Sequence, residues 1–259
     1  MGVALRAAIR SGELMLYYQP QVDREGKVLG AEALLRWQHE GNFISPAEFI
    51  PLAEEIGMIG TIGEWMLHTA CQQLKTWKIR NLPPVRLAIN ISPRQMEQSN
   101  FVEHILDELR QHGLDHSVLE VEITENLIMK EVERTVEKLK HLSASGIKIA
   151  IDDFGTGYSS LNYLKKFPIH TFKIDQSFIA DMERDGDTSI VTAIIAMAKG
   201  LHLNLIAEGV ETENQLAFLR KMECDEIQGF LLSEPLTAQA ATTMLIENVT
   251  PPAALSRRR

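Results

Sequence analysis

The chain has 259 residues, 45% of them hydrophobic, and a formal net charge of −9, so it is large enough for one α/β barrel or two smaller domains. The acidic charge excludes a protein that binds nucleic-acid polymers non-specifically, because such a protein needs an extended basic face. No apolar run is long enough to cross a bilayer and no secretion signal opens the chain, so we expect a cytoplasmic domain that makes no membrane contact.

Short β-rich runs alternate with amphipathic helical stretches, and no Pro/Gly/Ser-rich linker divides them. The runs that we predict as strands are 15–19, 28–34, 85–89, 119–123, 148–152, 171–174, 204–207 and 225–228. Only Asp23 to Lys27 separates the first two, which is too short for a helical crossover, so these two should pair antiparallel. We therefore predict an α/β fold: a (β/α)₈ TIM-like barrel with an antiparallel first strand, a core from about 5 to 245 and a tail at 250–259.

Helix-boundary residues support the elements between the strands. The segment 45–48, Ser-Pro-Ala-Glu, predicts an N-cap, a proline in the first turn and a capping box. Thr212 and Gln215 predict a second capping box. Gly200 is predicted to end a helix in the left-handed conformation.

Most of the predicted strands end in a polar residue. Barrels of this kind carry their chemistry at the carboxyl ends of the strands. The residues at these ends are Glu32, Asn90, Glu122, Asp152, Asp153, Lys173, Glu208 and Gln228. One acid at a strand end is usually a solvated residue, but so many together favour a common site. Oxygen ligands without cysteine or histidine favour magnesium or manganese over zinc, and two adjacent aspartates can serve a two-metal site, which makes phosphoryl chemistry the leading reaction class.

The cysteines and histidines do not predict a soft metal site. Cys71 and Cys224 lack the close spacing of thiolate ligands, so we expect both to be buried, small apolar side chains. His112 and His116 have the spacing of a helical metal pair, but a glycine between them indicates a helix-ending loop. We therefore expect solvated histidines there.

Several short motifs occur in a fixed order along the chain. They are YYQP at 17–20, EALLRW at 32–37, NIS at 90–92, EITEN at 122–126, DDFGTGYSSL at 152–161, FKID at 172–175, AEGVE at 207–211 and QGFLLSEPL at 228–236. In these motifs the chain resembles the EAL-domain phosphodiesterases, which open the ring of cyclic di-GMP, over roughly residues 5–236. Phe230 is one departure, because many relatives carry tyrosine there.

The resemblance implies a metal-dependent phosphodiesterase that is specific for cyclic di-GMP and forms linear pGpG by attack of a metal-activated water on phosphorus. It implies that Glu32, Asn90, Glu122 and Asp152 hold one ion. It also implies that Asp152, Asp153 and Glu208 approach a second. We expect Mg²⁺ or Mn²⁺ as cofactor and Ca²⁺ as an inhibitor, because calcium accepts looser coordination and is a poorer Lewis acid.

The same resemblance implies catalytic roles for Lys173, Glu208 and Glu32. Lys173 should lie beside the cations, which would lower its pKa and let it relay a proton, either as the base or by orienting the water. Arg36 is predicted on the loop just beyond the second strand. There its guanidinium group could bind a non-bridging phosphate oxygen.

Further contacts are implied for residues around this centre. Gln19, at the end of the first strand, together with Glu211 and Gln228, is implied to contact the substrate. Glu125 is implied to anchor the loop 153–160 and not to bind metal directly. Because two glycines give this loop backbone freedom, it could close over substrate, and the helix that follows is expected to form a homodimer surface.

A second function class stays open: a catalytically silent receptor that binds cyclic di-GMP and passes the signal to a partner. Intact metal and lysine positions argue against it. The segment 3–14 resembles the stretch that in many relatives follows a sensory or cyclase domain. The single domain over residues 1–259 is therefore either a whole protein or a piece excised from a larger multidomain regulator, with such a domain acting in cis or in trans.

Overall fold

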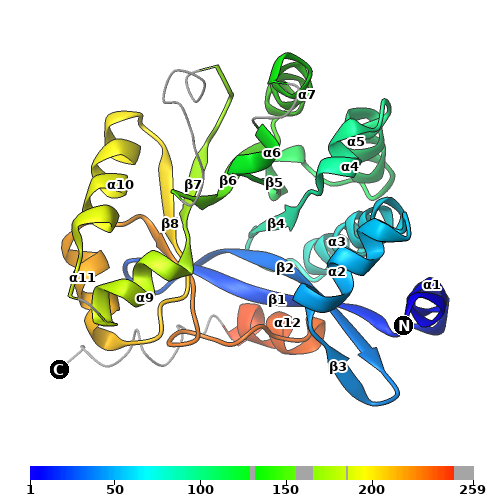
Figure 1. Ribbon diagram of the computed structural model, residues 1–259, viewed down its shortest axis with the longest axis horizontal. Helices are drawn as coiled ribbons and strands as arrows, with labels where there is room; N and C mark the ends of the chain where they lie inside the picture. The colour runs from blue at the N-terminus through cyan, green and yellow to red at the C-terminus, as the bar shows by residue number, and fades with distance from the viewer. Residues whose placement is uncertain (129–131, 156–165, 185, 248–259) are drawn as a thin grey trace.

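The computed structural model describes residues 1–128, 132–155, 166–184 and 186–247. Within these residues eight strands close into a barrel, and helices surround it (Figure 1). The barrel strands are β1 (Leu14–Asp23), β2 (Val28–His39), β4 (Arg86–Asn90), β5 (Leu119–Thr124), β6 (Lys148–Phe154), β7 (Thr171–Ile174), β8 (Asn204–Ala207) and β9 (Glu226–Ile227). The predicted α/β barrel is confirmed.

The first strand is the one reversed member of the ring. β1 pairs antiparallel with β2 on one side and with β9 on the other. All other neighbouring strands of the ring pair parallel, from β2 and β4 round to β8 and β9. The antiparallel pairing expected from the short connection is therefore confirmed, because a hairpin needs only a turn whereas a parallel pair needs a crossover.

The sequence pattern does not predict β3 (Asn42–Ile44). This strand pairs antiparallel with the far end of β2 and forms a hairpin outside the ring. Its turn contains Glu40 and Gly41, which both have positive φ, at 49° and 81°. The same hairpin carries β2 to His39, so the predicted end of this strand at Leu34 is wrong.

The helices lie outside the strands and cover them (Figure 1). They are α1 (Gly2–Ser11), α2 (Pro46–Glu55), α3 (Ile59–Ile79), α4 (Pro93–Glu97), α5 (Phe101–Gln111), α6 (Glu125–Ile128), α7 (Val132–Ala144), α9 (Gln176–Arg184), α10 (Ser189–Gly200), α11 (Glu213–Lys221) and α12 (Ala238–Glu247), with a 3₁₀ turn at His116–Val118. In the part of the chain that the structure describes, no helix combines the length and the apolar character that a membrane span requires.

The helix-boundary predictions have mixed outcomes. Thr212 and Gln215 form the predicted capping box at the start of α11. Ser45 precedes α2 with Pro46 in the first turn, but its side chain makes no capping hydrogen bond, so the capping box predicted there is wrong. Gly200 is the last residue of α10, and His202 takes the left-handed conformation at φ 57°, because the helix continues through the glycine.

Apolar and polar side chains alternate along the strands, so that the apolar ones form an outer layer and the polar ones face the barrel interior. In β5, Leu119, Val121 and Ile123 belong to the apolar core, whereas Glu120 and Glu122 take the alternate positions; all five are at most 1% exposed. Successive side chains of a strand point to opposite faces, so one set packs under the helices and the other faces the barrel axis. The inner set supplies the candidate site.

Three predicted features fall wholly or partly outside the described residues. The loop predicted at 153–160 is described as far as Gly155. The helix expected after this loop, with the dimer surface that we expect on it, and the tail at 250–259 lie beyond the described ranges.

Candidate active site

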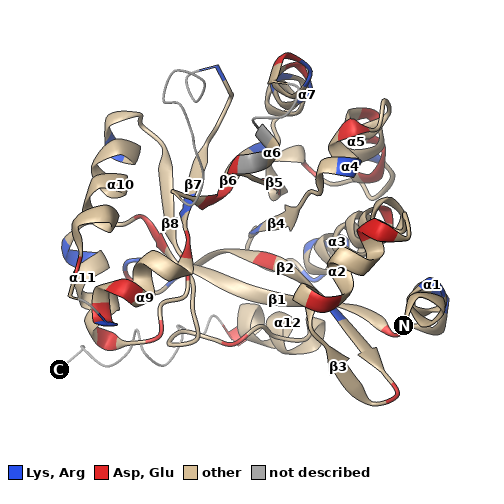
Figure 2. Cartoon of the chain, viewed as in Figure 1, with Lys and Arg blue, Asp and Glu red and all other residues tan. Residues whose placement is uncertain are grey.

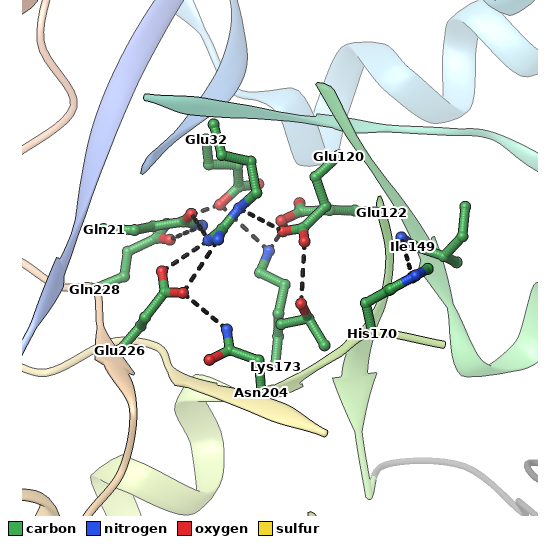
Figure 3. Close-up of polar contacts among 12 residues, drawn as sticks. Gln21, Glu32, Glu120, Glu122, Ile149, His170, Lys173, Asn204, Glu226 and Gln228 are labelled. Carbon is green, nitrogen blue, oxygen red and sulfur yellow. Dashed lines mark hydrogen bonds and ion pairs between the residues drawn. The ribbon is translucent and has the colours of Figure 1, made fainter. Parts of the chain in front are cut away.

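Four carboxylates surround one lysine at the carboxyl end of the barrel strands. Acidic and basic positions adjoin on the ribbon near β6 and β7 (Figure 2), and Glu32, Glu122 and Lys173 are drawn in Figure 3. Lys173, on β7, is fully buried. Its Nζ lies 2.8 Å from Glu122 Oε2 and 2.8 Å from Glu208 Oε1. It lies 3.2 Å from Asp152 Oδ1 and 3.4 Å from Glu32 Oε2. We call these five residues the lysine cluster; the structure thus brings together side chains that the sequence separates by as many as 176 positions.

Strand register and amide groups hold Glu32 in this cluster. Gln19 lies directly opposite Glu32 in the pairing of β1 with β2. Asn90 Nδ2 donates to Glu32 Oε1 at 2.7 Å, and Gln228 Nε2 donates to Glu32 Oε2 at 2.7 Å and to Gln19 Oε1 at 3.0 Å. Both carboxylate oxygens are therefore held, and Asn90 keeps its Oδ1 as an oxygen ligand.

The cluster shifts the protonation of its members in opposite directions. Burial would raise the pKa of Glu32, but Lys173 and the bonds from Gln228 and Asn90 lower it below its ordinary value. Burial and the charge of Glu32 raise the pKa of Glu122 well above its ordinary value. Burial also raises the pKa of Glu208 to about 8. Without a cation, the site therefore retains protons on some carboxyls near neutral pH.

The pKa of Lys173 is raised in this environment. Burial alone would lower it, but the attraction of Asp152, Glu122, Glu208 and Glu32 outweighs burial. The lowered pKa expected from the sequence depends on cations next to the amine. It stays a prediction for the metal-loaded site.

The donor set fits a hard divalent cation. Asp152, Asp153 and Glu208 bring one carboxylate oxygen each within 4.8 Å of one another. Both oxygens of Glu122 are buried; Oε2 is paired with Lys173 Nζ at 2.8 Å, and Oε1 finds no hydrogen-bond partner among the described residues. A cation such as Mg²⁺ prefers oxygen ligands, and this group supplies several carboxylates close together. The site can therefore hold a divalent metal.

Asp153 occupies a special backbone position at the end of β6. Its φ is 54°, in the left-handed region, and its N–H donates to Asp152 Oδ1 at 3.1 Å. This conformation turns the two adjacent aspartates so that both can reach Glu208. Burial and the charges of Asp152 and Asp175 raise the pKa of Asp153 to about 6. Asp175, which the sequence analysis does not single out, is thus a neighbour of the site.

Two of the predicted substrate contacts lie in strands. Arg36 is inside β2, so its predicted place on a loop is wrong: it lies opposite Met15 in the pairing of β2 with β1, which continues past the predicted end of the strand. Its guanidinium carbon lies 5.7 Å from the centre of the Tyr17 ring, and its Nη1 donates to Leu35 O at 3.0 Å. Gln19 lies in the middle of β1 and not at its end.

Glu125 and Glu211 occupy different surroundings. Glu125 is buried at the start of α6, and its Oε2 accepts a hydrogen bond at 3.2 Å from the N–H of Gly155, which has a φ of 100°. It therefore contacts the backbone directly after the double aspartate. Glu211 is exposed, and its N–H donates to Gln215 Oε1. Within the described ranges no polar contact is seen from its carboxylate to the cluster.

A second polar layer, which the sequence patterns did not predict, lies in the barrel interior next to the lysine cluster, two or four residues away along the strands (Figure 3). We call it the lower layer; its members are Gln21, Arg86, Glu120, Thr171, Asn204 and Glu226. The available signal is spacing, because Gln21, Glu120, Thr171 and Glu226 each stand two residues along the chain from a predicted site residue.

A separate cluster lies on the outer helices. His68 Nδ1 and His112 Nδ1 lie 3.0 and 3.6 Å from Glu108 Oε2. The His112 side chain is only 10% exposed, so its predicted solvation is wrong, because α3 packs across α5. His116 Nδ1 instead contacts Ser145 O at 2.8 Å. Cys71 and Cys224 are buried as predicted, and burial raises the pKa of each thiol to about 12.

A protein-family model described as "EAL domain" matches residues 3–235. The bifunctional diguanylate cyclase/cyclic di-GMP phosphodiesterase MucR of Pseudomonas aeruginosa is 43% identical over 238 residues, which cover 91% of this chain and 35% of MucR. The cyclic di-GMP phosphodiesterase NbdA of the same organism is 41% identical over 244 residues, 93% of this chain and 31% of NbdA. The chain thus spans about a third of the length of these relatives.

Solved structures agree with this relationship. The P. aeruginosa MucR phosphodiesterase in complex with cyclic di-GMP superposes with a TM-score of 0.89 at 42% identity, covering 92% of this chain and 97% of that one. The EAL enzyme Bd1971, bound to cAMP and cyclic di-GMP, superposes with a TM-score of 0.88 at 30% identity, covering 94% of this chain and 68% of that one.

Proposed function

The chain belongs to the EAL domain family, and we propose that it hydrolyses cyclic di-GMP to linear pGpG. The observation that carries this proposal is the lysine cluster beside the Asp152, Asp153 and Glu208 group, which unites a buried amine with a carboxylate set able to hold cations. The names of MucR and NbdA, which both state a cyclic di-GMP phosphodiesterase, support the same substrate.

We propose Mg²⁺ or Mn²⁺ as the cofactor, with two ions bound. Glu32, Asn90, Glu122 and Asp152 would hold one, and Asp152, Asp153 and Glu208 a second. When bound, such a pair supplies charge for the phosphoryl oxygens and lowers the pKa of a water molecule. Calcium should inhibit, because its larger, looser coordination is a poor match for this chemistry.

Lys173 is proposed to handle the proton of the attacking water. Bound cations would offset part of the negative charge that now raises the pKa of Lys173, so its proton would become easier to release. Nζ can then accept or pass on a proton, or orient the water. Water oxygen attacks phosphorus, the bond from phosphorus to the ribose 3′ oxygen breaks, and that oxygen leaves with a proton.

We propose that four residues around the lysine cluster bind the substrate. Arg36 would bind a non-bridging phosphate oxygen through its guanidinium group. Gln19 and Gln228 present amide groups next to Glu32, and Glu211 would contact the ligand from the segment after β8. Glu125 is proposed to hold the loop after Asp153 in the geometry that the second ion needs.

We also propose a homodimer, with its surface at the helix after the loop, and a sensory or cyclase domain as partner in cis or in trans. The bifunctional composition of MucR supports the second part. Analytical ultracentrifugation combined with activity measurements tests the dimer. A monomer that is fully active at all concentrations would contradict it.

Product analysis tests the function. The chain is incubated with cyclic di-GMP and Mg²⁺, Mn²⁺, Ca²⁺ or EDTA, and products are separated by chromatography. We expect pGpG with Mg²⁺ and Mn²⁺ and little with Ca²⁺ or EDTA. Glu32→Ala should abolish the product while its thermal unfolding in EDTA stays cooperative, and unchanged turnover would remove this acid from the metal site. Tight binding of cyclic di-GMP without any product would instead indicate a receptor.

A further inference from the structure

The lower layer is connected to Glu32 by an unbroken series of buried hydrogen bonds (Figure 3). Arg86 Nη2 donates to Gln21 Oε1 at 2.9 Å. Gln21 Nε2 donates to Gln228 Oε1 at 2.9 Å, and Gln228 Nε2 donates to Glu32 Oε2 at 2.7 Å. We call these four residues the amide relay; each is at most 8% exposed, so water has little access to replace any of the bonds.

Arg86 is itself held on several sides. Nη1 and Nη2 donate to Glu226 Oε1 and Oε2 at 3.1 and 2.7 Å, a two-pronged contact that fixes the guanidinium plane. Nε lies 3.0 Å from Glu120 Oε1. A Cβ at Gly30 would stand 3.0 Å from Gln21 Oε1 and 3.3 Å from Arg86 Nη2, so the missing side chain leaves room for this contact.

The two ends of the relay determine the direction of every bond in it. A guanidinium group only donates and an ionised carboxylate only accepts, whereas a glutamine amide has one end of each kind. Arg86 therefore requires Gln21 to present its oxygen, which turns the Gln21 NH₂ toward Gln228. Gln228 must then turn its NH₂ toward Glu32. If either amide turned over, two donors or two acceptors would face each other in a buried space.

Arg86 matters most when Glu32 shares its charge with a cation. Glu32 is then a weaker acceptor and does less to orient Gln228 by itself. The guanidinium group below keeps its charge at all accessible pH values, so it continues to select one orientation of both amides.

We propose that Arg86 and Gln21 are positioning residues that fix the Gln228 amide and, through it, the Glu32 carboxylate toward the first metal ion. This inference rests on the proposed function of the same site. Removing a side chain that hydrogen-bonds to a metal ligand typically lowers metal affinity or activity by about 10–100-fold.

The test compares Gln21→Met with Thr171→Val. Gln21→Met keeps the length of the side chain and leaves Arg86 bound to Glu226, but removes both relay bonds. Thr171→Val is the matched control: it removes one buried hydrogen bond of the lower layer, from Thr171 Oγ1 to Glu120 Oε2 at 3.0 Å, which is not part of the relay. Mn²⁺ affinity is measured by calorimetry and electron paramagnetic resonance without substrate, and thermal unfolding is measured in EDTA.

We expect Gln21→Met to weaken Mn²⁺ binding by about 10–100-fold. Thr171→Val should stay within about twofold of the wild type while losing a comparable amount of thermal stability in EDTA. Arg86→Lys should fall between wild type and Gln21→Met, because the ammonium group can still donate to Gln21 Oε1 but cannot make the two-pronged contact with Glu226. A purely structural role of Arg86 would not predict this partial retention of Mn²⁺ affinity.

Equal Mn²⁺ affinity in wild type and Gln21→Met would overturn the relay, and so would equal losses in Gln21→Met and Thr171→Val. These outcomes leave the proposed function standing if the wild type forms pGpG. Conversely, a wild type that binds Mn²⁺ but forms no pGpG overturns the function, while the relay is still judged by the affinities.

Discussion

Lys173 Nζ lies 2.8 Å from Glu122 Oε2, and both side chains are completely buried. A buried amine needs carboxylate partners, because alone it would be an uncompensated charge away from water. The other three carboxylates of the lysine cluster also lie within ion-pair distance of the Lys173 amine. In the absence of metal, Lys173 therefore acts as the internal cation of the site.

Lys173→Met should affect both stability and chemistry. Without the amine, four carboxylates remain close together, and unfolding in EDTA should become easier by about 3 kcal/mol or more. Mn²⁺ should restore part of this loss, since a cation replaces the missing charge. Chemical denaturation with and without Mn²⁺ measures the effect. Hydrolysis should slow far more than cyclic di-GMP binding weakens by calorimetry; the opposite pattern would make Lys173 a substrate-binding residue.

Arg36→Ala should mainly raise the substrate concentration needed for half-maximal rate, by roughly tenfold or more, because a charged hydrogen bond to phosphate is lost. Arg36→Lys keeps the charge but not the planar fork, so it should recover part of the loss. Steady-state kinetics on all three proteins decides the matter. An effect confined to the maximal rate would contradict phosphate binding by Arg36.

Glu125→Ala should lower the maximal rate by about tenfold or more, because the N–H of Gly155 loses its acceptor and the backbone after Asp153 is released. Glu125→Gln should retain most of the rate, since its amide oxygen can accept the same bond. Rate measurements at saturating Mn²⁺ separate the two variants. If both are equally impaired, the carboxylate charge matters and not the anchoring bond.

The metal-free protein should lose stability as pH rises from about 5 to about 8. Folding raises the pKa of Asp153 to about 6 and of Glu208 to about 8, so in this window the folded state holds protons that the unfolded state has released. Stability then falls with increasing pH, since the folded state binds more protons. Bound Mn²⁺ should remove this decline by displacing the protons. Denaturation between pH 5 and 8, in EDTA and in Mn²⁺, measures both trends, and a stability that rises with pH in EDTA would contradict the shifted pKa values.

Much of the architecture follows from local patterns in the chain. The eight predicted strand runs correspond to the barrel strands, because alternation and short turns are properties of neighbouring residues. The reversed first strand follows from the length of one connection. Strand order along the chain also places Glu32, Asp152, Lys173 and Glu208 at one end of the barrel, since parallel strands bring their carboxyl ends to the same side.

Contacts between distant strands were decided only in three dimensions. Gln21 and Gln228 are 207 positions apart, and nothing local to either residue indicates that their amides meet. The place of Arg36 within β2 depends on its pairing with Met15 of β1, and the environment of His112 depends on the packing of α3 against α5. Protonation is likewise a tertiary property: the same carboxyl chemistry gives a lowered pKa at Glu32 and a raised pKa at Glu122, because burial and the nearest charges differ.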